Sequence, residues 1–112
     1  MTKENVHEID KIMEITNCIV ETVHPQKVIL FGSFARGEDT KHSDYDLCVL
    51  TDDINHDDFD TQYFNIQNAI KEINQRQVDL IMKTKKKYNK NKECRAYVDY
   101  YIDKEGVILY EC

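Results

Sequence analysis

Apolar side chains recur along the chain with two different periods, which predict helices alternating with strands. The first helix is expected from Thr2, which can cap it, to about Val23, because its apolar residues keep mostly to one helical face. Pro25 follows and stops the helix, since the residue before a proline is pushed out of helical conformation. The positions expected to face the core are Val6, Ile9, Met13, Ile19, Val20 and Val23.

Short apolar runs predict four strands, at residues 27–31, 44–50, 78–82 and 107–110. Helices are expected between them: a short one that begins near Ser33, a longer one from Asp57 or Asp58, and a last one that Gly106 ends. The core face of the longer helix is expected to carry Phe59, Tyr63, Ile66, Ile70 and Ile73. One side of the last helix is expected to carry Cys94, Tyr97, Val98 and Tyr101.

The candidate chemistry lies where the first strand ends and the second begins. Ten residues separate the pair Gly32-Ser33 from Asp44, and Asp46 follows two positions later. Because strand side chains alternate between faces, the two aspartates are expected to point the same way. Carboxylates crowded on one face repel each other, and a divalent cation between them relieves the repulsion. The pattern therefore predicts a metal site at this end of the sheet.

This arrangement, with Ala35-Arg36-Gly37 between the two motifs and Asp79 in a later strand, resembles the signature of the DNA polymerase beta-like nucleotidyltransferase superfamily. Within it, the chain is similar to the smallest branch, the minimal nucleotidyltransferases, over nearly its whole length. The resemblance implies an α/β (α+β) fold of three-layer type, in which helices flank a short mixed sheet. It also implies transfer of a nucleoside monophosphate from a nucleoside triphosphate, with release of pyrophosphate.

The resemblance assigns a role to each candidate residue. Asp44 and Asp46 are expected to bridge two Mg²⁺ ions, for which Mn²⁺ can substitute, and Asp79 to complete one of these sites and accept the proton of the incoming hydroxyl. Gly32 and Ser33 are expected to hold the triphosphate at a helix N-terminus. For Arg36, two alternatives stay open: it contacts the triphosphate, or it pairs with a nearby acid.

Composition narrows the possible partners. A chain of 112 residues predicts a single domain, residues 1–112, with any acceptor-binding module on another chain. The net charge of −6 argues against stable nucleic-acid binding, which depends on neutralising phosphates. The Lys-rich residues 83–92 are expected to form a solvated loop rather than a binding patch, because Tyr88 is their only aromatic residue.

Cysteine usage and hydropathy bear on the compartment. The four cysteines form no C-x-x-C pair and are expected to be reduced thiols, which suits the cytoplasm. No run approaches the ~18 consecutive apolar residues of a membrane span, and the first residues do not resemble a signal peptide. A soluble, cytoplasmic protein is therefore expected.

Three hypotheses for the function follow from the resemblance. The first is an enzyme that moves AMP from ATP onto a hydroxyl of a protein, as the antitoxin of an all-helical HEPN-domain ribonuclease toxin. The second is a catalytically weak or inactive module that neutralises such a partner by masking it. The third is an antibiotic-type enzyme that modifies a small molecule, which is disfavoured because such enzymes need extra sequence to hold a sugar. Three clustered carboxylates favour the first, since a pure binder has no need of them.

Overall fold

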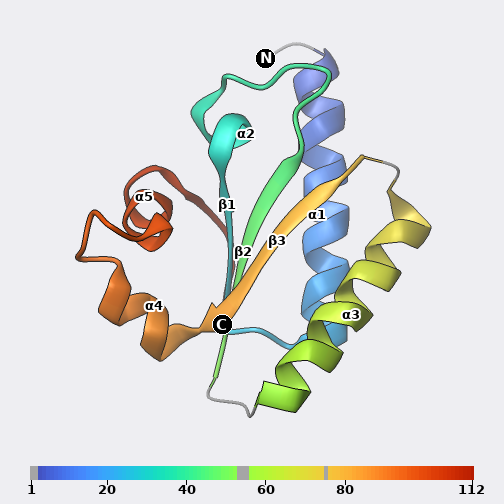
Figure 1. The fold of residues 1–112 in the computed structure, drawn as a ribbon. Helices are drawn as coiled ribbons and strands as arrows, with labels where there is room; N and C mark the ends of the chain where they lie inside the picture. The colour runs from blue at the N-terminus through green and yellow to red at the C-terminus, as the bar shows by residue number, and fades with distance from the viewer. Residues whose placement is uncertain (1–2, 53–55, 75) are drawn as a thin grey trace.

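A computed structural model describes the backbone of residues 3–52, 56–74 and 76–112, and the side chains of these residues except 3–7, 56 and 57. Helices and strands alternate along the chain (Figure 1). Their bounds are α1 Lys3–Val23, β1 Lys27–Phe31, α2 Gly32–Arg36, β2 Tyr45–Thr51, α3 His56–Ile73, β3 Val78–Thr84, α4 Lys85–Asn91, α5 Val98–Glu105 and β4 Val107–Glu111. The predicted cap at Thr2 and the core role of the Val6 side chain lie outside the described residues.

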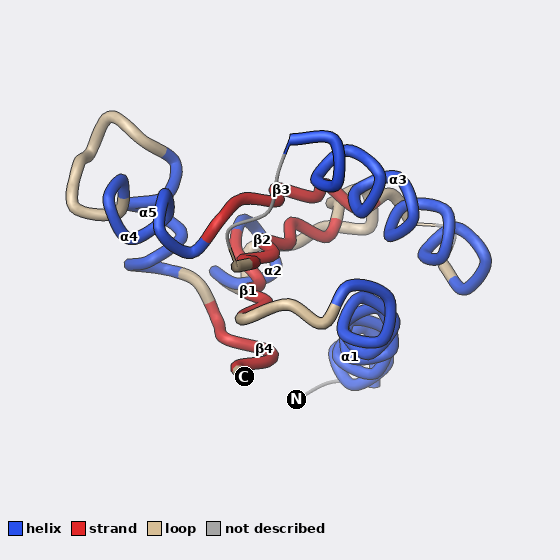
Figure 2. Tube along the Cα trace, turned by 90° about the horizontal axis from the view of Figure 1, so that it is seen from below, coloured by secondary structure: helices blue, strands red, loops and turns tan. Residues whose placement is uncertain are grey.

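The strands form one mixed sheet in the order β3-β2-β1-β4. Strand β1 is antiparallel to both of its neighbours, whereas β2 and β3 run parallel. Helices α1 and α3 cover one face, and α4 and α5 lie on the other (Figure 2). The predicted short mixed sheet with flanking helices is confirmed. Among the described residues, no helix has both the length and the apolar character that a membrane crossing requires.

The larger core lies between the sheet and the pair α1 and α3. Its buried strand residues alternate along the sequence, as expected for one face of a strand: Tyr45, Leu47 and Val49 in β2, and Val78 and Leu80 in β3. From α1, however, the buried residues are Ile12, Ile15 and Ile19. Ile9 and Met13 lie on the flank of this stripe and are 44% and 36% exposed, so their prediction as core residues was wrong.

A second core lies between the sheet and α4 and α5. It contains Ile29, Cys48, Leu50, Tyr88 and Ile102, which come from strands β1 and β2 and from both helices. The predicted solvated loop at residues 83–92 was therefore wrong, because most of this stretch is helical and buries the Tyr88 side chain. Lysine is compatible with such a helix because it is a good helix former and its long chain reaches solvent.

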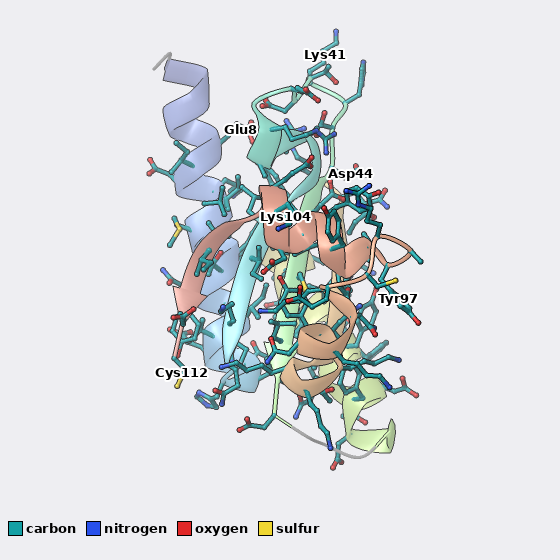
Figure 3. The ribbon with its side chains drawn as sticks, turned by 90° about the vertical axis from the view of Figure 1, so that its left-hand side faces the viewer. Glu8, Lys41, Asp44, Tyr97, Lys104 and Cys112 are labelled. Atoms are coloured by element: carbon teal, nitrogen blue, oxygen red, sulfur yellow. The ribbon has the colours of Figure 1, made fainter. Side chains whose placement is uncertain are left out.

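The last helix begins later than predicted and buries a different face. It starts at Val98, so Cys94 and Tyr97 precede it. The side chains expected on one side of the helix are exposed: Cys94, Tyr97, Val98 and Tyr101. Figure 3 shows Tyr97 at the periphery of the molecule. The buried residues of α5 are Ile102 and Asp99, whose carboxylate forms an ion pair with Lys83 of β3. The face of α5 that packs against the sheet is therefore the one that carries Asp99 and Ile102. Gly106 ends the helix, as predicted.

Candidate active site

The site begins where β1 passes directly into α2. Phe31, the last residue of β1, lies opposite Asp46 of β2, and Gly32 follows with a φ of +74°. A Cβ atom at this glycine would overlap Oδ2 of the Asp46 carboxylate. Gly32 is therefore required by two local features, the left-handed backbone and the close approach of Asp46. The sequence pattern pointed to this glycine, but the contact that excludes a side chain is visible only in the fold.

Asp46 and Asp79 lie side by side on neighbouring strands. They are partners in the parallel register of β2 and β3, so their side chains point to the same face of the sheet. That face carries α4 and α5, because the adjacent residues Leu47 and Leu80 belong to the opposite core. The structure thus brings together two aspartates that are 33 positions apart in the sequence.

The ionised form of the Asp46 carboxylate is disfavoured by partial burial and by the negative charges near it. Its pKa is raised from 3.8 to about 6 by burial, which is the largest cause, together with repulsion from Asp79, a hydrogen bond to Asp79 and the charge of Asp44. The charge of Arg36 opposes them weakly. Near neutral pH the cluster therefore holds excess negative charge that a cation would relieve.

Asp44 lies in the loop just before β2 and not within the strand as predicted, because β2 begins at Tyr45. Its side chain is partly buried, and its charge contributes to the raised pKa of Asp46. Figure 3 shows Asp44 toward the same end of the molecule as Lys41 and Glu8, which are labelled there, and far from Cys112. The loop that carries Asp44 is therefore part of the site, and its position depends on what anchors it.

Arg76 anchors that loop, and no sequence signal pointed to it. Its guanidinium donates hydrogen bonds to the carbonyl oxygens of Ser43 and Lys41, the latter at 3.4 Å. The same group lies 5.4 Å from the ring centroid of Phe34 in α2 and 5.3 Å from that of Tyr45 in β2. Arg76 thus ties the loop to the first helix after β1 and to the start of β2. A lone arginine in a polar turn has no periodicity that could reveal this role.

A carboxylate of α1 completes this cluster. Glu8 forms an ion pair with Arg76 at 3.4 Å and accepts a hydrogen bond from the Tyr45 hydroxyl. The tyrosine is buried, with 2% of its surface exposed, and its ring also packs against Phe34 at a centroid distance of 4.8 Å. The Asp44 loop is therefore held between α1 and the strand that carries Asp46.

Of the two alternatives predicted for Arg36, the structure shows the pairing with nearby acids. Its Nε lies 2.9 Å from Glu38 and its Nη1 lies 3.6 Å from Glu105 of α5. The side chain is exposed, so these ion pairs leave it able to exchange partners. Ser33, in contrast, is partly buried at the beginning of α2, and its carbonyl oxygen accepts a hydrogen bond from the Glu38 amide at 2.9 Å.

An open cleft of about 580 Å³ adjoins the aspartate pair. Asp46 and Asp79 line one side, and Tyr63, Gln67 and Lys71 of α3 line the other. The prediction of Tyr63 as a core residue was wrong, because 40% of its surface is exposed at this cleft.

The aspartates fit a divalent cation by their chemistry. Oxygen donors of this kind are the ligands that Mg²⁺ prefers, and the raised pKa of Asp46 reflects the charge that such an ion would neutralise. Within the described part of the chain, no three His, Cys, Asp or Glu side chains are already arranged as a complete ligand set. Phosphate oxygens would then supply some of the ligands, as is common for Mg²⁺.

The chain is similar to known proteins in sequence and in fold. Residues 10–104 match the family model described as nucleotidyltransferase domain. A protein of Methanocaldococcus jannaschii named "putative protein adenylyltransferase" is 36% identical over 81 residues, which cover 71% of this chain and 80% of that protein.

Two solved structures share the fold. One is described as a "putative nucleotidyltransferase from Sulfolobus solfataricus"; it superposes with a TM-score of 0.61 at 18% identity, over 96% of this chain and 83% of that one. The other is described as "toxin-antitoxin with AMP-PNP"; it superposes with a TM-score of 0.58 at 19% identity, over 92% of this chain and 73% of that one.

Proposed function

This chain belongs to the nucleotidyltransferase domain family, and from that premise we propose that it transfers AMP from ATP to a hydroxyl group of a protein. The observation that carries the proposal is the pairing of Asp46 with Asp79 directly against Gly32, where α2 begins. This places acidic oxygens beside the free backbone amides at the start of the helix. Nucleotidyl transfer needs both, a cation site and donors for the triphosphate.

The role proposed for each site residue follows from where it lies in the fold. Asp44 and Asp46 would hold Mg²⁺, and Asp79 would add a ligand on the side that faces the cleft. Bound Mg²⁺ would supply Lewis-acid stabilisation of the charge that develops on the phosphate oxygens. Ser33 and the first amides of α2 would orient the β and γ phosphates.

The transfer itself requires one bond to form and one to break. The acceptor hydroxyl oxygen attacks the α phosphorus of ATP, and the bond from that phosphorus to the oxygen bridging to the β phosphorus breaks. Pyrophosphate leaves with the electron pair. The proton of the hydroxyl passes to Asp79, which lines the cleft.

A protein acceptor is supported by the comparisons. The relative at 36% identity carries the name "putative protein adenylyltransferase", and one structural neighbour is described as "toxin-antitoxin with AMP-PNP". We therefore propose a toxin as the acceptor, specifically a helical HEPN-domain ribonuclease. The net charge of −6 suits a basic partner of this kind and would speed their encounter.

Position-specific labelling tests the reaction. The purified chain is incubated with Mg²⁺, a HEPN-domain protein and ATP that carries radiolabel either at the α or at the γ phosphate. Label in the HEPN protein from α-labelled ATP alone supports AMP transfer. Label from γ-labelled ATP would indicate a kinase, and no label from either would overturn the proposal. Asp39→Asn, at an exposed aspartate in the loop after α2, is the control for the expected loss in Asp46→Asn.

A further inference from the structure

The cleft beside the paired aspartates follows the outer edge of β3. Every residue from Gln77 to Ile81 lines it, although successive strand residues point to opposite faces of the sheet. Leu80 packs in the core under α1 and α3, whereas Ile81 packs against the core under α4 and α5. β3 is the border strand of the sheet. A single cleft that contacts β3 residues from both faces of the sheet therefore lies along this edge.

The backbone of β3 presents hydrogen-bonding groups to this cleft. The amide of Tyr45 donates to the carbonyl of Gln77 at 3.1 Å, so the backbone groups of Gln77 point toward β2. Backbone groups of successive strand residues point to alternate sides, so those of Asp79 also point to β2 while those of Val78 and Leu80 point away from the sheet. An extended polypeptide is the ligand whose own backbone groups match this spacing.

The opposite wall of the cleft suits the side chains of such a polypeptide. Helix α3 runs beside β3 (Figures 1 and 2), and its Tyr63 is an exposed aromatic residue at the cleft. Gln67 donates a hydrogen bond to the Tyr63 hydroxyl at 3.3 Å, which orients the ring. Residues of an added strand that point toward the α3 face would contact this ring.

We propose that the β3 edge is the acceptor site, where an extended, hydroxyl-bearing segment of the partner protein adds as a further strand. The inference rests on the proposed function and specifies how its substrate is held. A residue paired with Asp79 would have its side chain on the same face as Asp79 and Asp46, with Cβ atoms about 5 Å apart. A tyrosine, serine or threonine at that position presents its hydroxyl to the carboxylates.

The acceptor site at the β3 edge supplies the attacking hydroxyl and leaves the proposed reaction otherwise unchanged. The oxygen of that hydroxyl forms the new bond to the α phosphorus, pyrophosphate departs with the electrons of the broken bond, and the proton passes to the adjacent Asp79. The product is a phosphodiester that links AMP to the partner's side chain. The residues on either side of the acceptor keep their backbone bonds to Val78 and Leu80 throughout.

Three synthetic peptides test strand addition. The probe is the acetylated, amidated heptapeptide Val-Lys-Val-Tyr-Val-Lys-Val, used with labelled ATP and Mg²⁺. One analogue carries N-methyl groups on the two valines beside the tyrosine, and the other carries an N-methyl group on the tyrosine. The amides of the two valines beside the tyrosine face Val78 and Leu80, so the analogue methylated on these valines should lose at least about tenfold in kcat/KM. The tyrosine amide faces away from β3, so the analogue methylated there should lose less than about twofold. Equal values for both analogues would overturn the edge site.

A matched pair of variants locates the peptide in the cleft. Tyr63→Ala is expected to raise the KM for the peptide about fivefold or more, because the ring forms part of the wall. Phe64→Ala is the control, since this neighbouring aromatic residue is 65% exposed and does not line the cleft. Equal KM values for the two variants would contradict the proposal.

Failure of this inference is distinguishable from failure of the proposed function. If the HEPN-domain protein receives AMP while the peptide analogues and the two variants behave alike, the edge site is refuted and the function stands. If neither the HEPN-domain protein nor any peptide receives AMP, both are refuted.

Discussion

Replacing Asp46 by Asn should make the metal-free protein more stable at neutral pH. The carboxylate is partly buried and lies beside Asp79 with Asp44 near, so its ionised form is disfavoured in the folded state. Asn keeps the shape of the side chain and removes the charge. It can also donate a hydrogen bond to the Asp79 carboxylate.

The size of this stabilisation and its dependence on pH follow from the raised pKa of Asp46. A rise from 3.8 to about 6 corresponds to about 3 kcal/mol of unfavourable free energy for the ionised form. Because Asp46 is only partly buried, solvent screening reduces this to about 1–2 kcal/mol. Below pH 3.8 the group is protonated in both the folded and the unfolded chain and costs nothing. The cost grows between pH 3.8 and about 6 and is complete above that range.

Urea unfolding at several pH values in the presence of a chelator measures this difference. At pH 8 the free energy of unfolding of Asp46→Asn should exceed that of the parent by about 1–2 kcal/mol. Near pH 4 the two curves should nearly coincide. Asp39→Asn, in an exposed loop, should leave the unfolding free energy unchanged at both values.

Addition of Mg²⁺ or Mn²⁺ extends the test. A metal that binds only the folded state raises the free energy of unfolding with the logarithm of its concentration once that exceeds Kd, so the parent should gain stability and Asp46→Asn should not. If the variant is less stable than the parent at pH 8 without metal, or if the difference does not change with pH, the ionised Asp46 carboxylate does not destabilise the metal-free fold.

Three further outcomes are expected. Gly32→Ala should cost more than about 2 kcal/mol of unfolding free energy because its Cβ meets a carboxylate, whereas Gly37→Ala, with a similar φ of +71° but open space, should cost about 1 kcal/mol. Arg76→Lys should lower kcat for AMP transfer about tenfold with little change in the KM for ATP, because the loop before β2 loosens. Lys83→Met should cost about 3–5 kcal/mol in urea unfolding, since it leaves the fully buried Asp99 without its cation, and adding Asp99→Asn should recover most of the loss.

The sequence was sufficient to predict the elements that carry the candidate site. Residues 27–31 form a strand as predicted, because a short run of consecutive apolar residues is typical of a strand that is buried on both faces of a sheet. The helix after it and the strand that carries Asp46 also lie close to where the pattern placed them. The register that joins Asp46 to Asp79 could not be predicted from periodicity, because it depends on which strands become neighbours.

The C-terminal part of the chain was harder to predict, because which face of α5 is buried depends on contacts with residues outside the helix. Tyr97 and Tyr101 continue an apolar pattern in the sequence, yet both are exposed. The buried residues of α5 are Ile102 and Asp99, which pairs with Lys83. The anchoring role of Arg76 was hidden for the same reason. Its partners come from α1, from α2 and from the loop before β2, and only the folded chain brings them together.

The intact mass of a HEPN-domain partner after incubation with this chain, ATP and Mg²⁺ shows whether AMP transfer takes place. The partner should gain the mass of one or more AMP groups with the parent chain, and none with Asp46→Asn even when that variant still binds the partner. A partner that is fully neutralised with no added mass would contradict the proposed function and identify the chain as a masking module. Equal addition by the parent and by Asp46→Asn would equally contradict it, because the paired aspartates would then have no part in the transfer.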